Sequence, residues 1–500
     1  MGSNTKRVAK NTLYMYFRMI FLMVISFYTS RALLATLGIE DYGIYSVVGS
    51  VAVSFSALKV LFSESIQRFL NIEKGRNNFK HQNVIFNMSL YIHFAISILF
   101  ILVVECAGVW LLYNKLNIPA DRIDAAFFVL QMTILSTAIS IISVVYDAVI
   151  VSNERFGVYA AISIFDGIYR LAIIGLLPYV SFDSLKVYSA ALVFLPIVML
   201  VYQIIYCRHF EECKYRFLYN KSIFKEIFSL SGWNFFGNIS FSLLHEGINM
   251  LLNIYGGLTF NASRAISYKV KHAVAQINHN TLVALRPRIM QKGATQDTNA
   301  LMDNIITVSR ISVFTMFIPV VPVIVYCDQL LSIWLKEVPE SASTFTRLIL
   351  VGIIIRSLHE PINMFYMTLA RIKRMMLIEM FVMLSFLIII YLSLVNGMTL
   401  EFVFVETAIM ELIIILCLVL NAKNEVGVGL SSYLKSVLLV MLELIGIAAI
   451  LGYACNEAYE PEGAISTIAS AGFLAILLLI IVFLFLNNNE RQIIKKIIKK

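Results

Sequence analysis

The sequence has little charge for its length. Only 14% of its 500 residues are Asp, Glu, Lys or Arg, whereas about a quarter of the residues in a soluble domain are charged. Hydrophobic residues make up 59% and the mean hydropathy is +0.81. Because no soluble fold of this size buries so many apolar side chains, the sequence predicts a protein of the lipid bilayer.

Several signatures of other functions are missing as well. The six cysteines are scattered without a Cys-x-x-Cys pair, so we expect neither a disulfide framework nor a metal site. The chain has no G-x-x-x-x-G-K-[ST] phosphate loop, which argues against direct ATP hydrolysis. We expect no cofactor. We also expect no nucleic-acid partner, because a net charge of +9 in a membrane protein usually reflects basic cytoplasmic loops.

Long apolar runs fill most of the chain. A crossing of the bilayer needs about 20 apolar residues, and fourteen segments satisfy this. The predicted fold is an all-α polytopic membrane protein whose crossings lie near 12–35, 43–69, 85–113, 125–150, 157–178, 184–207, 225–255, 261–290, 304–335, 342–370, 375–396, 401–421, 432–453 and 463–486. The basic N-terminus has no small-residue cleavage site after it, so the first segment is interpreted as a retained helix.

The connections alternate in charge, which predicts their sides. Connections such as "NERF", "RPRIMQKG" and "RIKR" are basic, and those between them, such as "YGGLTFN" and "KEVPE", are neutral or acidic. The positive-inside rule then places both termini in the cytoplasm. Without a crossing at 261–290 every later connection would change sides, so this polar segment is predicted to span the membrane.

An internal repeat suggests how the crossings are grouped. Shifting the chain by 218 residues places "LLATLG" (33–38) on "LLNIYG" (251–256). It also places "KG" at 74–75 on "KG" at 292–293. This offset corresponds to six crossings, and parallel repeats are common in transporters. We predict two pseudo-symmetric six-helix lobes around a central cavity, 1–210 and 211–422, followed by two extra helices and a basic tail in 423–500.

Charges inside crossings are costly and usually face a cavity or a partner. The cations proposed to bind substrate are Arg31, Lys59, Arg264, Lys269, Lys271, Arg310 and Arg356, and the carboxylates proposed to couple transport to an ion are Glu64, Asp166, Glu246 and Glu360. Other interpretations exist: Asp166 and Arg170 are spaced as a helical ion pair, and Arg310 lies near enough to a helix end to reach the membrane interface.

The segment "SRAISYKVKHAVAQINHN" (263–280) is the most unusual crossing. A helix with Arg264, Lys269 and Lys271 cannot face lipid and must line water or a polar ligand. A cationic cavity favours an anion, and arginine binds phosphate through two parallel hydrogen bonds.

The stretch "NTLYMYFRMIFLMVISFYTSRALLATLGIEDYGIYSVVGSV", followed by "QRFLNIEKG", resembles the N-terminal hairpin of Wzx-type polysaccharide and O-antigen flippases, in the multidrug/oligosaccharidyl-lipid/polysaccharide (MOP) exporter superfamily. The resemblance implies a flippase that moves an undecaprenyl-diphosphate-linked oligosaccharide across the bacterial inner membrane by alternating access coupled to H⁺ or Na⁺. It implies contact with membrane lipids and leaves open an association with a glycan polymerase or glycosyltransferases.

Three alternatives remain. A multidrug exporter of the same superfamily would favour an acidic cavity for cationic drugs, whereas deep cations outnumber carboxylates in the first ten segments. A flippase for the peptidoglycan precursor lipid II would share the cationic cavity. A membrane glycan polymerase would need sizeable outer loops, and the connections are all short. The sequence therefore predicts a transporter and not an enzyme.

Overall fold

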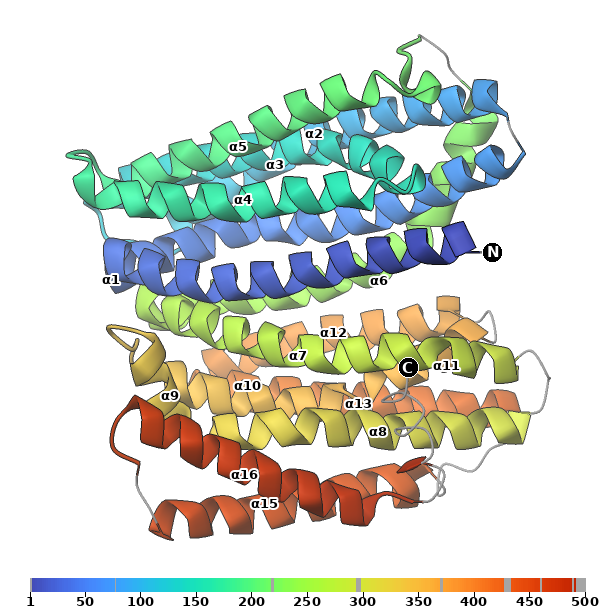
Figure 1. Cartoon of the computed structure of the whole chain (residues 1–500). Coiled ribbons are helices and arrows are strands. Elements are labelled where there is room, and N and C mark those ends of the chain that lie inside the picture. The colour runs from blue at the N-terminus through green and yellow to red at the C-terminus, as the bar shows by residue number, and fades with distance from the viewer. Residues whose placement is uncertain are drawn as a thin grey trace. The chain divides into compact units, whose positions relative to one another are not determined.

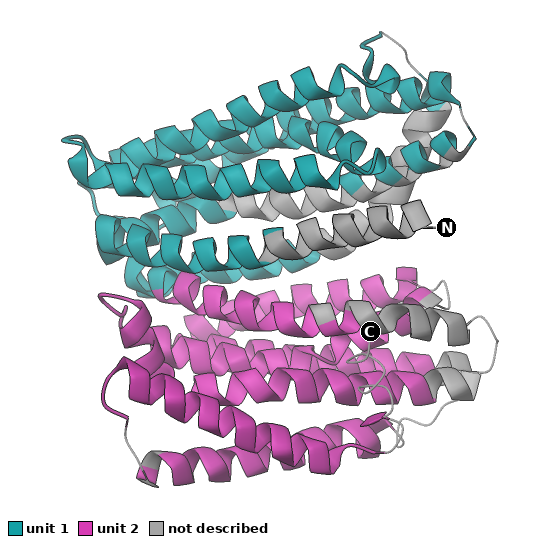
Figure 2. Cartoon of the chain, viewed as in Figure 1, with its two compact units in different colours: residues 1–262 teal, residues 263–500 magenta. Residues whose placement is uncertain are grey.

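A computed structural model describes the backbone of residues 2–76, 78–216, 220–293, 298–368, 372–426, 433–458, 461–487 and 490–491. Their side chains are described except those of 2–17, 19, 51–62, 64–65, 68, 72, 75, 222–239, 280, 283–293, 298–302, 368, 423–426, 456 and 458. By their contacts the residues form two compact units, 1–262 and 263–500 (Figure 2). The lobe boundaries expected at 210 and 422 stay a prediction.

The first unit is built from long helices that run roughly parallel to one another (Figure 1). Its elements are α1 (Gly2–Gly75), α2 (Phe79–Asn114), α3 (Ile123–Ser152), α4 (Phe156–Leu176), η1 (Leu177–Tyr179), α5 (Ser184–Cys207), η2 (Glu211–Cys213), α6 (Lys221–Gly256) and the start of α7 (Leu258–Gly293). Helix α3 packs against α1, α2 and α5. Ala126, Val129 and Leu130 lie at the centre of this packing and are almost wholly buried.

Two glycines turn the chain at matching places. Helix α1 is two helices joined at Gly38, where the backbone has φ 79° and ψ 173°, and α6 is joined to α7 at Gly257, where φ is 85°. Such values favour glycine because other residues rarely tolerate positive φ. Each hairpin therefore consists of two long helices joined at a glycine. The two glycines are 219 positions apart. The superposition of the two hairpins stays a prediction.

Asparagines hold the α6–α7 turn to the rest of its unit. The Asn253 amide donates to Asn261 Oδ1 at 3.0 Å, and the Asn261 amide donates to Asn249 Oδ1 at 3.0 Å. The Asn249 amide in turn donates to the carbonyl of Ser46 in α1 at 3.2 Å. Helix α1 also comes very close to α7 at Gly43, where an added Cβ would lie 2.4 Å from the Leu258 carbonyl oxygen.

The connection after α5 is fixed to α2. The Asn83 amide donates to the carbonyls of Glu212 and Lys214 at 2.8 and 2.6 Å, and the Asn87 amide also reaches Lys214. At another connection of this unit, Arg122 forms ion pairs with Asp41 at 2.5 Å and Asp183 at 2.6 Å. Polar side chains thus order the ends of the helices where apolar packing stops.

The second unit packs around α8 and α13. Its further elements are α8 (Thr298–Val325), α9 (Cys327–Trp334), α10 (Ala342–Arg356), α11 (His359–Thr368), α12 (Ile372–Val395), α13 (Phe402–Val426), η3 (Leu434–Leu438), α15 (Leu439–Ala458) and α16 (Ala464–Phe485). Helix α13 packs on α10 and α12, while α8 packs on α10, α15 and α16. The last two helices therefore attach to this unit through α8, and α16 also packs on α9.

The all-helical membrane fold expected from the sequence is confirmed. Eleven helices within the described ranges are long and apolar enough to cross a membrane. Three further segments that we expected to cross correspond to the second half of α1 and to α6 and α7, which are helices of sufficient length. Helix α7 continues unbroken through the polar segment 263–280, and its place in the membrane stays a prediction.

Candidate functional site

The cations of α7 gather around one aromatic ring. The guanidinium carbon of Arg264 lies 4.1 Å from the centre of the Tyr268 ring, and the ammonium of Lys271 lies 4.6 Å from it. Spacings of four and three residues place these side chains on one face of the helix, and an aromatic ring attracts cations to its faces. Two of the three expected cations are thus brought together by Tyr268.

Burial distinguishes these cations. Arg264 is only 6% exposed, whereas Lys269 and Lys271 are half-buried. Ser267, on the same helix, is fully buried and donates to the Ala342 carbonyl at 3.1 Å, which attaches α7 to α10. Arg264 is therefore the most deeply buried of the three cations on α7.

Arg356, the last residue of α10, forms an ion pair with a neighbouring helix. Its Nη1 donates to both carboxylate oxygens of Glu411 in α13, at 2.6 and 2.8 Å. Close by in sequence, Nε2 of His359 in α11 lies 2.7 Å from Oε1 of Glu379 in α12. A guanidinium held by a carboxylate in this way is less available to a ligand, so the geometry favours a structural role for Arg356.

Glu360 and Arg310 also have partners. The carboxylate of Glu360 lies 3.1 Å from Nδ1 of His279 in α7, and both side chains are partly exposed. Arg310 in α8 forms an ion pair with the fully buried Glu490 and donates to the carbonyls of Ser436 and Phe485 at 2.9 and 2.8 Å. The surroundings of Arg310 are those of an anchor for the C-terminal helices.

The remaining candidates lie in the first unit. Arg31 is exposed on α1 and Glu246 is half-buried on α6. Asp166 and Arg170 form the helical ion pair expected from their spacing, at 3.0 Å. The side chains of Lys59 and Glu64 lie outside those that the structure describes, so their proposed roles stay predictions.

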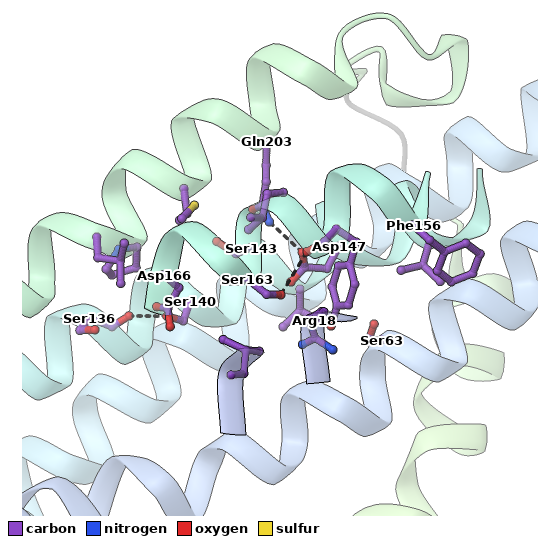
Figure 3. A pocket seen from close by; sticks show the side chains of 18 of the residues that line it. Arg18, Ser63, Ser136, Ser140, Ser143, Asp147, Phe156, Ser163, Asp166 and Gln203 are labelled. Carbon is purple, nitrogen blue, oxygen red and sulfur yellow. Dashed lines mark hydrogen bonds between the residues drawn. The ribbon is translucent and has the colours of Figure 1, made fainter. Parts of the chain in front are cut away.

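A polar pocket of about 600 Å³ lies inside the first unit (Figure 3). Helices α1, α3, α4 and α5 supply its lining, which includes Arg18, Ser63, Gln67, Ser136, Ser140, Ser143, Asp147, Tyr159, Ser163, Asp166, Arg170 and Gln203. The Gln203 amide donates to the Asp147 carboxylate at 2.8 Å, and the Arg18 guanidinium lies 4.8 Å from the centre of the Tyr159 ring. The pocket therefore combines ionic and neutral polar groups within a membrane-spanning bundle.

Sequence reasoning missed several of these residues. The carboxylates of Asp147, Glu379 and Glu411 lie in helices apolar enough to cross a membrane, and a full count of charges inside the predicted crossings would have found them. Gln203 and the pocket serines carry no charge, so no comparable signal marks them. Glu490 lies in a tail that the sequence describes only as basic.

No protein-family model matches the chain, and no curated protein matches its sequence. Solved structures do resemble it. Lipid II flippase MurJ in an inward closed conformation has a TM-score of 0.71 and 14% identity, over 94% of this chain and 98% of that one. An inward-facing multidrug resistance MATE family transporter has a TM-score of 0.68 and 12% identity, over 85% of this chain and 99% of that one.

A MOP-superfamily transporter from Pyrococcus furiosus resembles the chain as well, with a TM-score of 0.55 and 12% identity over 83% of this chain and 93% of that one. These identities are too low to transfer a substrate, and the similarity concerns the fold. Together with the apolar helices, it shows a multi-pass membrane protein with the fold of the MOP-superfamily transporters.

Proposed function

We propose that this protein is a flippase that moves an undecaprenyl-diphosphate-linked oligosaccharide, a unit of O-antigen, capsule or exopolysaccharide, across the bacterial inner membrane. The observation that carries the proposal is the cationic cluster on α7, where Arg264 and Lys271 lie against the Tyr268 ring. A diphosphate supplies the negative charge that offsets the mutual repulsion of these cations. Its oxygens also match the planar donor fork of arginine.

The transport step is proposed to be alternating access driven by an ion gradient. Protonation of a carboxylate or histidine changes the charge of a pair of side chains, and such a change can favour one conformation over another. The pairs His279–Glu360 and Asp166–Arg170 provide such groups in separate units. Glu64 and Glu246 complete the set of candidates.

A lipid II flippase is the second candidate. The resemblance to MurJ covers nearly all of both chains, and lipid II is also a lipid-linked diphosphate, so the α7 cluster would suit either substrate. A drug exporter is less consistent with this cluster, because cationic drugs would be repelled by Arg264 and Lys271.

Reconstituted vesicles can separate these functions. The protein would be given a lipid-linked oligosaccharide, lipid II or a cationic dye, and movement across the membrane would be measured for each. We expect transport of the lipid-linked oligosaccharide and its loss in the Arg264→Ala/Lys269→Ala/Lys271→Ala variant. Normal transport by that variant would overturn the proposed site, and transport of the dye alone would overturn the proposed substrate class.

Two variants refine the test. Arg264→Lys keeps the charge but removes the fork, so it should retain partial transport if charge alone matters and lose most of it if bidentate contact matters. Lys373→Ala serves as a control, because this cation is exposed at the start of α12 and lies outside the cluster. Membrane abundance of every variant must equal that of the unaltered protein.

A further inference from the structure

The pocket of the first unit contains polar atoms that the protein itself does not satisfy. Ser143 Oγ, Gln203 Oε1 and Arg18 Nε are buried and have no hydrogen-bonding partner among the residues that the structure describes. Gln203 is 2% exposed and Ser143 is 9% exposed, and both line the pocket. A buried polar group without a partner costs about 1–3 kcal/mol, so a ligand that satisfies these three atoms would be stabilised in the pocket.

Hydrogen-bonding chemistry restricts what that ligand can be. Gln203 Oε1 can only accept, Arg18 Nε can only donate, and the Ser143 hydroxyl can do both. A phosphate ion that is fully ionised cannot donate to Gln203, and a metal cation cannot accept from Arg18. A ligand hydroxyl donates and accepts, so a compound with several hydroxyls can satisfy all three atoms.

Charge and size agree with a neutral ligand. The pocket contains two arginines, Arg18 and Arg170, and two aspartates, Asp147 and Asp166, so it has no excess charge to attract an ion. Five serines share the lining with these groups. Its volume of about 600 Å³ falls within the range of small-molecule sites, about 300–1,000 Å³, and is far larger than a single ion requires.

We infer that this pocket binds a sugar residue, a neutral group with several hydroxyls, and that it holds part of the glycan during transport. This inference rests on the proposed function, because a lipid-linked oligosaccharide would bring such a group to the protein. The site for sugar in the first unit is then separate from the site for diphosphate on α7. Specificity for a particular glycan would arise in the pocket, since phosphate contacts are common to all lipid-linked substrates.

Binding can be measured without transport. Purified protein in detergent would be mixed with free saccharides (glucose, galactose, N-acetylglucosamine and their disaccharides), and contact would be detected by saturation-transfer difference NMR. We expect at least one saccharide to bind and its signal to fall at least fivefold in Ser143→Ala and in Gln203→Leu. Ser143→Ala should not lower the melting temperature, because the hydroxyl it removes has no partner in the described part of the protein.

Ser189→Ala is the matched control. Ser189 is a buried serine of α5 outside the pocket, and its hydroxyl donates to the Leu185 carbonyl at 2.8 Å. This variant should bind saccharide normally. Full saccharide binding by Ser143→Ala and Gln203→Leu would overturn the inference, and so would binding of Na⁺ or inorganic phosphate in place of every saccharide.

The two proposals can fail separately. If the α7 triple variant loses transport while no saccharide binds the unaltered protein, the sugar site is wrong and the flippase stands. If saccharides bind and the pocket variants lose them, the sugar site is supported even where the lipid-linked oligosaccharide is not transported. In transport, Ser143→Ala should raise the substrate concentration for half-maximal rate without changing abundance.

Discussion

Arg356 and Glu411 form an ion pair between α10 and α13 whose disruption we expect to be costly. Glu411 is buried, and both of its carboxylate oxygens accept from one guanidinium nitrogen of Arg356. Arg356→Leu would leave the carboxylate without its counter-charge. We expect the free energy of unfolding to fall by about 3 kcal/mol, measured by thermal or denaturant unfolding in detergent.

The double variant Arg356→Leu/Glu411→Leu is the control. Replacing both partners by apolar residues often restores stability, so this variant should unfold near the unaltered protein and retain transport. A double variant that is stable but inactive would instead identify Arg356 as a residue of the substrate site.

The sequence shows which residues are charged inside the membrane but not which of them are paired. Asp166 and Arg170 could be paired in advance because they share one helix. Arg310 and Glu490 could not, because the pairing of residues so far apart depends on how helices pack. The neutral pocket residues Ser143 and Gln203 could not be identified from the sequence. A serine or glutamine that lines a pocket cannot be distinguished there from one whose hydrogen bonds are satisfied within its own helix.

At the scale of elements, the contact of α1 with the start of α7 depends on a missing side chain. A Cβ on Gly43 would lie 2.4 Å from a backbone oxygen of Leu258, which cannot rotate away. We therefore expect Gly43→Ala to force the helices apart and lower the free energy of unfolding by about 1–3 kcal/mol, measured by thermal unfolding.

Gly49→Ala lies on the same helix, and its Cβ would meet nothing within 4 Å among the residues that the structure describes. Alanine is the better helix former by about 0.5–1 kcal/mol, so this change should leave stability unaltered or increase it. Equal melting temperatures for the two variants would contradict the close contact at Gly43.

The helices themselves could be predicted well. Apolar length located the helices, although the single crossing expected at 304–335 consists of two helices, α8 and α9. The 218-residue offset indicated matching hairpins. The turn glycines Gly38 and Gly257 lie 219 positions apart, which agrees with this offset to one residue. Short polar features escaped prediction: the asparagine contacts at the α6–α7 turn and the attachment of the η2 region to α2 depend on tertiary packing.

At the scale of the whole molecule, the orientation of the chain depends on α7. With fourteen crossings and both termini in the cytoplasm, reporters inserted at Asn153 should read inside and those at Pro119 and Pro339 outside. The reading at Pro339 is decisive because α7 precedes it. An inside reading there, with the others unchanged, would mean that α7 does not cross the membrane.

The fold class followed from composition because so little charge and such long apolar runs are compatible only with helices in a bilayer. The superfamily fold is supported by structural resemblance at 12–14% identity, a level at which sequences alone no longer match. Substrate identity requires the positions of individual side chains, and these are determined by packing between helices that are distant in sequence.

The pairing of Arg310 with Glu490 also has a consequence for biogenesis. The two residues are 180 positions apart, so a ribosome makes Arg310 long before its counter-charge exists. During that interval α8 contains a cation whose final partner has not been synthesised. A chain truncated before Glu490 would retain Arg310 in the membrane without this counter-charge. We expect proteases of the quality-control system to degrade such a chain. The pair can therefore form only after α15 and α16 have been synthesised.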